Sequence, residues 1–397
     1  MIQLSDKKDC CGCSACVQRC PKQCIRMVED YEGFLYPQID TSRCIDCGLC
    51  EKVCPIINNG GGSPRDPLKV LAANNKNLTI RTDSSSGGIF TLLAEQTLRK
   101  GGVVFGARFD KDWQVVMDYT ETIEGLSIFR GSKYVQCRFK DSFKDVERFL
   151  KEGRVVLYSA NPCVIAALRK FLRKDYANLL AVDFLCHGVP SPGVWQRYLQ
   201  EVRIDQKLSE GKSSVLPSIK DIQFRDKSQG WKKFRFVLNL SYDTSEGQKS
   251  TVLSSVYNAN IYMSGFLHDI ILRPSCYTCP AREGKSLSDI TIADYWGIEH
   301  RHPELDDDQG TGLVMIYTQK GVEAFPIDKV DFKESSLEGL LPFNGGLKTY
   351  TEMHPKREWF FQKFAQGDSV SKSLRKIIEP SFTKKVVRKI FRILKIK

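Results

Sequence analysis

Two stretches decide the fold of the N-terminal region: CCGCSACVQRCP at residues 10–21 and CIDCGLCEKVCP at residues 44–55. Both contain the spacing C-x2-C-x2-C-x3-C-P, and the second repeats the first at a shift of 34 positions. Three closely spaced thiolates can wrap one face of an iron-sulfur cubane while the fourth reaches a neighbouring cubane. The repeat therefore predicts two 4Fe-4S clusters held by one duplicated unit.

Because the fourth cysteine of each motif binds the cluster of the other motif, the spacing assigns the ligands of both clusters. The first cluster takes Cys10, Cys13, Cys16 and Cys54, and the second takes Cys44, Cys47, Cys50 and Cys20. Cys11 and Cys24 do not fit the register, so we interpret them as packing residues near the clusters. A pair of zinc ribbons is the alternative, but such sites use two CxxC knuckles rather than three evenly spaced cysteines before Cys-Pro.

The rest of the composition is that of an ordinary globular protein. The 397 residues are 42% hydrophobic and 27% charged, and no apolar run approaches the roughly 18 residues that a membrane-spanning helix needs. The N-terminus lacks the basic and then apolar pattern of a secretory signal. Ten of the 15 cysteines precede residue 55, and in a reducing compartment metal explains them better than disulfides. We therefore expect a soluble, cytoplasmic metalloprotein.

Changes in composition divide the chain into four segments. Residues 1–58 are predicted to form a ferredoxin-like domain with two 4Fe-4S clusters, and residues 59–67, rich in Asn, Gly, Ser and Pro, a linker. Residues 68–380 are predicted to form the main domain and residues 381–397 a basic amphipathic tail. The expected fold class is a multidomain combination of α+β and α/β architecture.

Apolar periodicity indicates the architecture of the main domain. Short apolar strands at 103–109, 155–158 and 179–185 alternate with amphipathic helices at 143–150 and 164–172, which predicts an α/β domain with a mixed sheet. Longer alternating runs between residues 222 and 253 predict an antiparallel insertion or an extra sheet. The segment 256–272 is predicted to be a helix, and 289–294 one further strand.

Five separated blocks of the main domain resemble the coenzyme F-420 hydrogenase/dehydrogenase beta subunit family, across nearly all of residues 68 to about 345. The blocks are residues 84–91, 131–136, 161–163, 183–192, and 276–279 together with 288–297. Members of this family bind FAD and iron-sulfur clusters. The resemblance implies an FAD-dependent oxidoreductase that moves electrons between a reduced carrier, such as a deazaflavin, a ferredoxin or a nicotinamide, and a partner protein or substrate.

Four further cysteines suit a third 4Fe-4S cluster. Cys163 and Cys186 each follow an apolar strand, which places them at carboxyl ends of strands, where open α/β sheets collect cofactors. Cys276 and Cys279 form a CxxC turn and bring the thiols to four, the number that one cubane needs. A structural zinc on the same thiols, or buried cysteines without metal, are the alternatives.

Three of the blocks are predicted to bind FAD non-covalently. The residues concerned are Ser84, Ser85, Ser86, Gly87, Gly88, Gly131, Ser132, Lys133, Tyr134, Asn161 and Pro162. The serines can cap the helix that follows, and the glycines let backbone N–H groups approach a pyrophosphate near the helix dipole. Lys133 can place a cation near the N1–C2 carbonyl region of the flavin, and Tyr134 can stack on its ring. An ordinary helix cap and an exposed loop are the alternatives.

The chain departs from the family pattern at one flavin block. Where the family usually shows Gly-Thr-Pro-Cys-Gln, residues 160–164 are Ala-Asn-Pro-Cys-Val, so a glycine and a hydrogen-bonding glutamine are absent. The thiols themselves are intact. The alternative function is therefore a non-catalytic electron-transfer conduit that keeps its clusters, lacks flavin and docks to a partner enzyme.

His187 is the candidate catalytic residue. It follows Cys186 at a strand end, and an imidazole titrates near neutrality, so it is predicted to donate a proton or a hydrogen bond on the substrate side. A structural role is the alternative.

The positive charge is concentrated in the tail. The last 17 residues contain seven Lys or Arg and no acid, which leaves +5 of the formal +12 for the other 380 residues. Written as a helix, the tail is apolar on one side and basic on the rest, which predicts peripheral contact with an anionic inner-membrane surface or with an acidic partner. A helix packed back on the main domain is the alternative. No nucleic acid partner is expected, because no recognition motif accompanies the charge.

Overall fold

The computed structural model describes residues 1–58, 62–210, 215–244, 247–347 and 351–379. Within these ranges no helix is both long and apolar enough to cross a bilayer. The predicted tail, 381–397, lies outside the described residues, as do residues 59–61 of the predicted linker. Residues 62–67 run beside the segment that follows Cys279, because Gly62 and Arg65 donate backbone hydrogen bonds to the carbonyls of Lys285 and Glu283.

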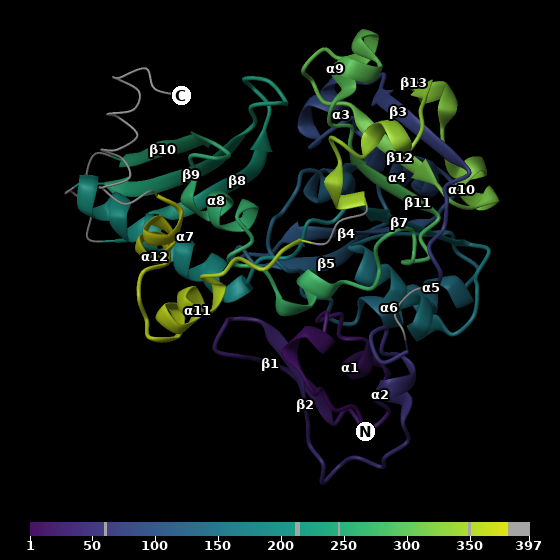
Figure 1. The fold of residues 1–397 in the computed structure, drawn as a ribbon, viewed down its shortest axis with the longest axis horizontal. Helices are drawn as coiled ribbons and strands as arrows, with labels where there is room; N and C mark the ends of the chain where they lie inside the picture. The colour runs from purple at the N-terminus through teal and green to yellow at the C-terminus, as the bar shows by residue number, and fades with distance from the viewer. Residues whose placement is uncertain (59–61, 211–214, 245–246, 348–350, 380–397) are drawn as a thin grey trace.

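The N-terminal domain is small and built on the cysteine motif. Strands β1 (Ile25–Glu29) and β2 (Leu35–Ile39) pair antiparallel. Helices α1 (Ala15–Arg19) and α2 (Leu49–Lys52) begin at equivalent places in the two repeats and carry Cys16 and Cys50. This domain lies at the bottom of Figure 1, below α5 and α6.

The main domain is organised around an eight-stranded sheet in the order β13-β3-β12-β11-β7-β6-β4-β5. The strands are β3 (Lys69–Asn75), β4 (Val103–Phe109), β5 (Val115–Thr120), β6 (Val156–Ser159), β7 (Leu179–Phe184), β11 (Ile290–Asp294), β12 (Gly312–Ile316) and β13 (Val330–Glu334). The central strands β4, β6, β7 and β11 are parallel, and the outer pairings are antiparallel. The prediction of a mixed sheet is confirmed.

Helices cover both faces of this sheet. Helix α4 (Ile89–Arg99) packs with one core cluster, while α5 (Ser142–Lys151) and α6 (Pro162–Leu172) pack with the larger cluster on the other face. Pro162 occupies the first turn of α6, where its missing N–H costs nothing. The larger cluster also includes Phe34 and Val53 of the N-terminal domain, so the two domains share one core.

A second, three-stranded sheet is formed by β8 (Ser218–Asp226), β9 (Arg235–Thr244) and β10 (Gly247–Val256). All its pairings are antiparallel, as predicted for this insertion. In Figure 1 it lies to the left of the main sheet, with α7 (Pro192–Glu210), α8 (Ile261–Leu267), α11 (Arg357–Ala365) and α12 (Val370–Ile378) nearby. The remaining elements are α3 (Leu78–Asp83), α9 (Ile298–Arg301), α10 (Gln319–Ala324), η1 (Lys7–Asp9), η2 (Glu124–Phe129), η3 (Pro274–Thr278), η4 (Pro303–Leu305), η5 (Ile327–Lys329), η6 (Glu338–Leu340) and η7 (Gly345–Leu347).

The prediction of one helix over 256–272 is wrong. Helix α8 begins only after Asn260, whose side chain accepts a hydrogen bond from the backbone N–H of Met263 and so caps the helix. It ends at Leu267, and Asp269 has a positive φ of 59° that an α-helix does not accommodate. The buried residues that follow continue the apolar pattern as irregular chain leading to Cys276.

The two domains meet through a close backbone contact. Gly33, in the turn between β1 and β2, has a φ of +79°, and a Cβ there would lie 2.6 Å from the Cα of Gly193. The N–H of Gly193 donates to the carbonyl of Gly33 at 3.2 Å. A side chain at either position would separate the domains, which is the physical reason for glycine on both sides.

Candidate iron-sulfur and flavin site

The second set of predicted ferredoxin ligands opens to the surface. Cys20, Cys44, Cys47 and Cys50 line one cavity, and Cys24 lines it too. The sulfur of Cys24 lies 3.4 Å from the sulfur of Cys20. Backbone N–H groups of Ile2 and Asp46 donate to the sulfurs of Cys50 and Cys44, which is how proteins tune iron-sulfur ligands. Because Cys47 is exposed, this end of the domain can be reached by another protein.

The first set faces the main domain. Cys13, Cys16 and Cys54 are each 8% exposed, and Cys13 belongs to the core cluster shared by the two domains. Burial, followed by the neighbouring thiols Cys10 and Cys54, raises the pKa of Cys16 well above its usual range. A cluster needs thiolates, so loading this set must release protons that burial otherwise keeps on the sulfurs.

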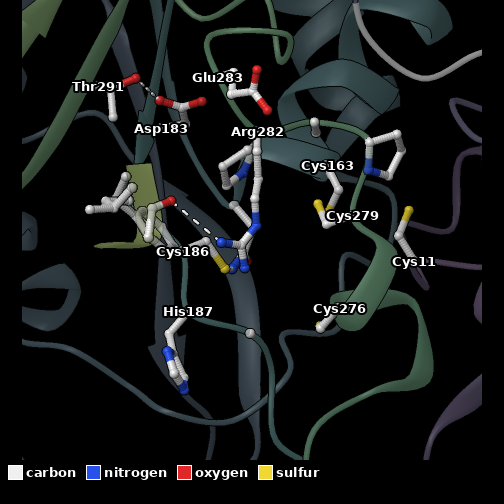
Figure 2. Close-up of a pocket in the computed structure, with 18 of the residues that line it drawn as sticks. Cys11, Cys163, Asp183, Cys186, His187, Cys276, Cys279, Arg282, Glu283 and Thr291 are labelled. Atoms are coloured by element: carbon white, nitrogen blue, oxygen red, sulfur yellow. Dashed lines mark hydrogen bonds between the residues drawn. The ribbon is translucent and has the colours of Figure 1, made fainter. Parts of the chain in front are cut away.

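The four cysteines of the predicted third set share one cavity. Cys163 sits in the first turn of α6, directly after β6, and Cys186 follows β7. Cys276 lies in η3, and Cys279 directly follows it. Figure 2 shows all four around the cavity that they line. Among the described residues no three His, Cys, Asp or Glu side chains converge on a point that would hold a single ion.

Cys11 also lines this cavity, which the sequence did not indicate. It is 7% exposed, and the neighbouring thiols of Cys13 and Cys163 hold its pKa well below the usual range. Its side chain therefore connects the first set to the third. The sequence showed only that Cys11 does not fit the spacing of the cluster ligands, which does not indicate where its side chain lies.

Polar groups support the third set. The Asn161 amide donates to the sulfur of Cys186 at 3.3 Å, and the N–H of Val189 donates to Cys276 at 3.3 Å. Burial raises the pKa of Cys279 to about 11. Burial also raises the pKa of Asp183, which lines the same cavity and accepts a hydrogen bond from Thr291, to about 6. The donors are soft thiols in an enclosed site, a set that suits iron-sulfur chemistry.

His187 lines the edge of this cavity, but its ring points away from Cys163 and Cys279 (Figure 2). Its Nε2 lies 2.6 Å from a carboxylate oxygen of Asp269, and the ring meets Phe266 edge-on. The carboxylate fixes the orientation of the imidazole. The structure thus places His187 beside the thiols without directing it at them.

The predicted flavin residues separate into two groups. Ser132 donates its N–H to the hydroxyl of Ser85 at 2.7 Å, so the 84–88 turn and the 131–134 loop lie together. Asn161 and Pro162 line the thiol cavity instead. A Cβ on Gly87 would lie 2.4 Å from the carbonyl oxygen of Ala73, so this glycine is needed to pack the turn against β3.

Two side chains predicted to contact flavin are engaged within the protein. The Nζ of Lys133 donates to the carbonyls of Arg130 and Gly131 at 3.0 and 3.1 Å. Burial lowers its pKa to about 8. The Tyr134 ring stacks on Phe266 with centroids 4.7 Å apart.

The sequence also did not indicate two buried basic residues, Lys227 beside the 84–88 turn and Arg225 beside Asp294. Lys227 donates to the carbonyl of Ser86 at 3.3 Å, and burial lowers its pKa to about 8. Arg225, 9% exposed, donates one Nη to Asp294 at 2.5 Å. Its Nε and other Nη have no hydrogen-bond partner among the described residues. Nothing in the local sequence of β8 marks these residues, because only the fold brings them to these places.

Comparisons with known proteins bear on both domains. Residues 153–334 match the family described as the C-terminal part of the beta subunit of coenzyme F420 hydrogenase/dehydrogenase, and residues 9–56 match the 4Fe-4S dicluster domain. These matches confirm the predicted family resemblance, over residues 153–334 of the stretch from 68 to about 345 in which it was expected.

Several curated ferredoxins match the chain over a short stretch. A ferredoxin from Mycolicibacterium smegmatis is 45% identical over 42 residues, 11% of this chain and 35% of the relative. A 7Fe ferredoxin from Hydrogenibacillus schlegelii is 46% identical over 43 residues, 11% of this chain and 49% of the relative. The chain thus spans a third to a half of the length of these relatives.

Among solved structures, a chain of the F420-reducing [NiFe] hydrogenase complex from Methanosarcina barkeri is similar to this one. The likeness covers 80% of this chain and 93% of that chain, at 19% identity and a TM-score of 0.45.

Proposed function

We propose that this iron-sulfur electron-transfer protein, which is related to the beta subunit of coenzyme F420 hydrogenase/dehydrogenase, is an FAD-dependent oxidoreductase. It would pass electrons between a reduced carrier, either a deazaflavin, a ferredoxin or a nicotinamide, and a partner protein or substrate. The observation that carries the proposal is the cavity shared by Cys163, Cys186, Cys276 and Cys279 at the carboxyl edge of the sheet. We infer that these thiols hold a third 4Fe-4S cluster.

The three thiol sets have an order that suits electron transfer. Cys11 lies between the third set and Cys13 of the first set. The second set follows in the ferredoxin domain and ends at the exposed Cys47. Electrons delivered at the main domain would therefore pass from the third set to the first, then to the second, and leave at the surface.

The proposed site of the flavin is beside the 84–88 turn. When bound, FAD supplies the conversion between two-electron chemistry at the carrier and one-electron transfer at the clusters. The hydrogen bond between Ser132 and Ser85 would hold the two loops in place around it. Arg225 offers two unpartnered guanidinium nitrogens beside Tyr134 and Asp294, which suits an electron-rich group of the cofactor.

The electron-transfer conduit without flavin is the second candidate, and a specific observation favours it. Lys133 and Tyr134 are both engaged within the protein, by backbone carbonyls and by Phe266. A chain that had lost flavin would retain such internal contacts. It would still need all three thiol sets.

Anaerobic purification and reconstitution, followed by denaturation and identification of the released flavin, tests the choice. We expect about one FAD per chain. Arg225→Met should lower the FAD content with iron unchanged, while Arg235→Met, on the neighbouring strand β9, should leave both unchanged. If denaturation releases no flavin and added FAD does not bind, the conduit replaces the oxidoreductase.

His187 is proposed as the proton donor or hydrogen-bonding group on the substrate side. Its carboxylate partner Asp269 would keep the imidazole oriented at the edge of the cavity. His187→Ala should lower turnover with the identified donor. Equal turnover by the variant and the parent protein would eliminate this role.

A further inference from the structure

Two buried arginines join the main domain to the ferredoxin domain, and they differ in their partners. Arg357, 5% exposed, pairs with both carboxylate oxygens of Glu32, at 3.0 and 2.7 Å. Arg273 is fully buried, at 0% exposed. It donates to the carbonyls of Cys10 and Leu35, at 2.6 and 3.0 Å, and to the side-chain oxygen of Gln136, at 2.9 Å. All the acceptors of Arg273 are neutral.

No carboxylate among the described residues forms an ion pair with Arg273, and the ionisable groups that act on it most strongly are Cys10, Tyr36, Cys11 and Cys276. A buried charge without a counter-charge is strongly destabilising, whereas hydrogen bonds to neutral carbonyls compensate it only in part. The guanidinium also lies over the ring of Tyr36, 4.2 Å from its centroid. The arrangement is therefore complete only if negative charge comes from something bound to the neighbouring thiols.

The position of Arg273 indicates which bound group supplies this negative charge. It holds the backbone of Cys10, a ligand of the first set, and it lies three residues before Cys276 of the third set. A 4Fe-4S cluster with four thiolate ligands is an anion, and it gains one further negative charge on reduction. A fixed cation in a low-dielectric interior favours the more negative, reduced form.

We propose that Arg273 is the counter-ion of the clusters on either side of it and holds the reduction potential of the first cluster above the value it would have without this charge. Its effect on the third cluster rests on the function proposed above, but its effect on the first cluster depends only on the ferredoxin ligands. The second cluster should feel it least, because Arg273 bonds to the backbone of Cys10 in the first set and no ligand of the second set is among the groups that act on it most strongly. Arg273 is thus a positioning residue that orders the potentials along the chain of clusters.

The test is an anaerobic redox titration of the full-length, cluster-loaded protein, followed by EPR spectroscopy. Arg273→Gln should lower the potential of the first cluster and leave the second unchanged at parental iron content. Arg273→Lys, which keeps the charge, should retain most of the parental potential. In the Cys276→Ala, Cys279→Ala background the third cluster is absent, so the shift of the first cluster is measured whether or not the third cluster exists.

A second variant keeps the arginine in place. Gln136→Glu puts a carboxylate beside Nη1 of Arg273, so it should lower the potential of the first cluster in the same direction. The control is Glu32→Gln with Arg357→Gln, which removes the neighbouring buried pair and should not shift this potential.

Unchanged potentials in both Arg273→Gln and Gln136→Glu, at parental iron content, overturn the proposal. Equal shifts in the Gln and Lys variants with none in Gln136→Glu also overturn it, since hydrogen bonding and not charge would then be responsible. If Arg273→Gln does not fold, Gln136→Glu decides alone.

Discussion

The ferredoxin thiols and the third thiol set reach similar arrangements by different means. The former come from one stretch between Cys10 and Cys54 and are held by a two-stranded sheet and helices of four or five residues. The latter come from segments between Cys163 and Cys279, positioned by an eight-stranded sheet with buried apolar clusters on both faces. A domain of about 60 residues buries little apolar surface and is only marginally stable on its core, so bound metal adds a large share of its stability. The first region should therefore depend on its clusters for its fold, and the second should not.

Removal of the clusters should produce the largest difference in protease resistance between the two regions. When iron is chelated anaerobically, residues 1–58 should become sensitive to protease while the main domain stays resistant, because metal-binding energy is folding energy only in the former. Timed proteolysis with mass spectrometry measures this. Equal resistance of both regions after complete removal of iron would show that the ferredoxin domain folds on its core alone.

The iron content should reveal the third set. The reconstituted parent protein should hold about 12 iron atoms and the variant Cys276→Ala with Cys279→Ala about 8, since each cubane contains four. Cys137→Ala is the control, because this cysteine is buried in the same domain, at 8% exposed, but lines neither thiol cavity. If the parent protein holds only about 8 iron atoms and the double variant holds the same number, there is no third cluster.

The two regions also differ in how much of their structure could be predicted from the sequence. The spacing around Cys10 and Cys44 predicted the N-terminal motif, and periodicity predicted β4 at Val103–Phe109 with its ends correct. Both are local signals. The positions of Cys11 near Cys163, of Lys227 beside the 84–88 turn and of Arg225 beside Asp294 depend on which strands become neighbours. Apolar periodicity also continued past Leu267 into buried irregular chain, and so suggested too long a helix.

The junction of the two regions should respond strongly to loss of one charge. Glu32→Gln leaves Arg357 buried without its carboxylate, which should cost about 3–5 kcal/mol in the free energy of unfolding. Glu32→Gln together with Arg357→Met should cost clearly less, because no unpaired charge then remains. Urea denaturation of the cluster-loaded protein, followed by tryptophan fluorescence, compares the three proteins. If the single variant were no less stable than the double, the ion pair would not join the domains.

The stability of the protein should also depend on pH through Asp183, which lines the cavity of the third thiol set. Burial raises the pKa of Asp183 from an ordinary 3.8 to about 6, so the folded state binds more protons than the unfolded state between these values. Its ionisation therefore destabilises the fold progressively as pH rises through this range, by up to about 3 kcal/mol above pH 6. The stability of Asp183→Asn relative to the parent should rise by this amount from pH 4 to pH 7. Urea denaturation at several pH values measures it, and a difference independent of pH would contradict the assignment.

The smallest effect is expected at Cys11, where the two regions meet. This thiol is next to a predicted ligand of the first cluster and lines the cavity of the third, yet four other cysteines are available to each. Cys11→Ala should therefore leave iron near 12 atoms per chain and cost only about 1 kcal/mol of stability, the usual effect of trimming one buried atom. Cys163→Ala should lower iron to about 8. The reverse result, with iron lost in Cys11→Ala and kept in Cys163→Ala, would make Cys11 a ligand of the third cluster, and the main domain would then depend on the ferredoxin domain to complete its own site.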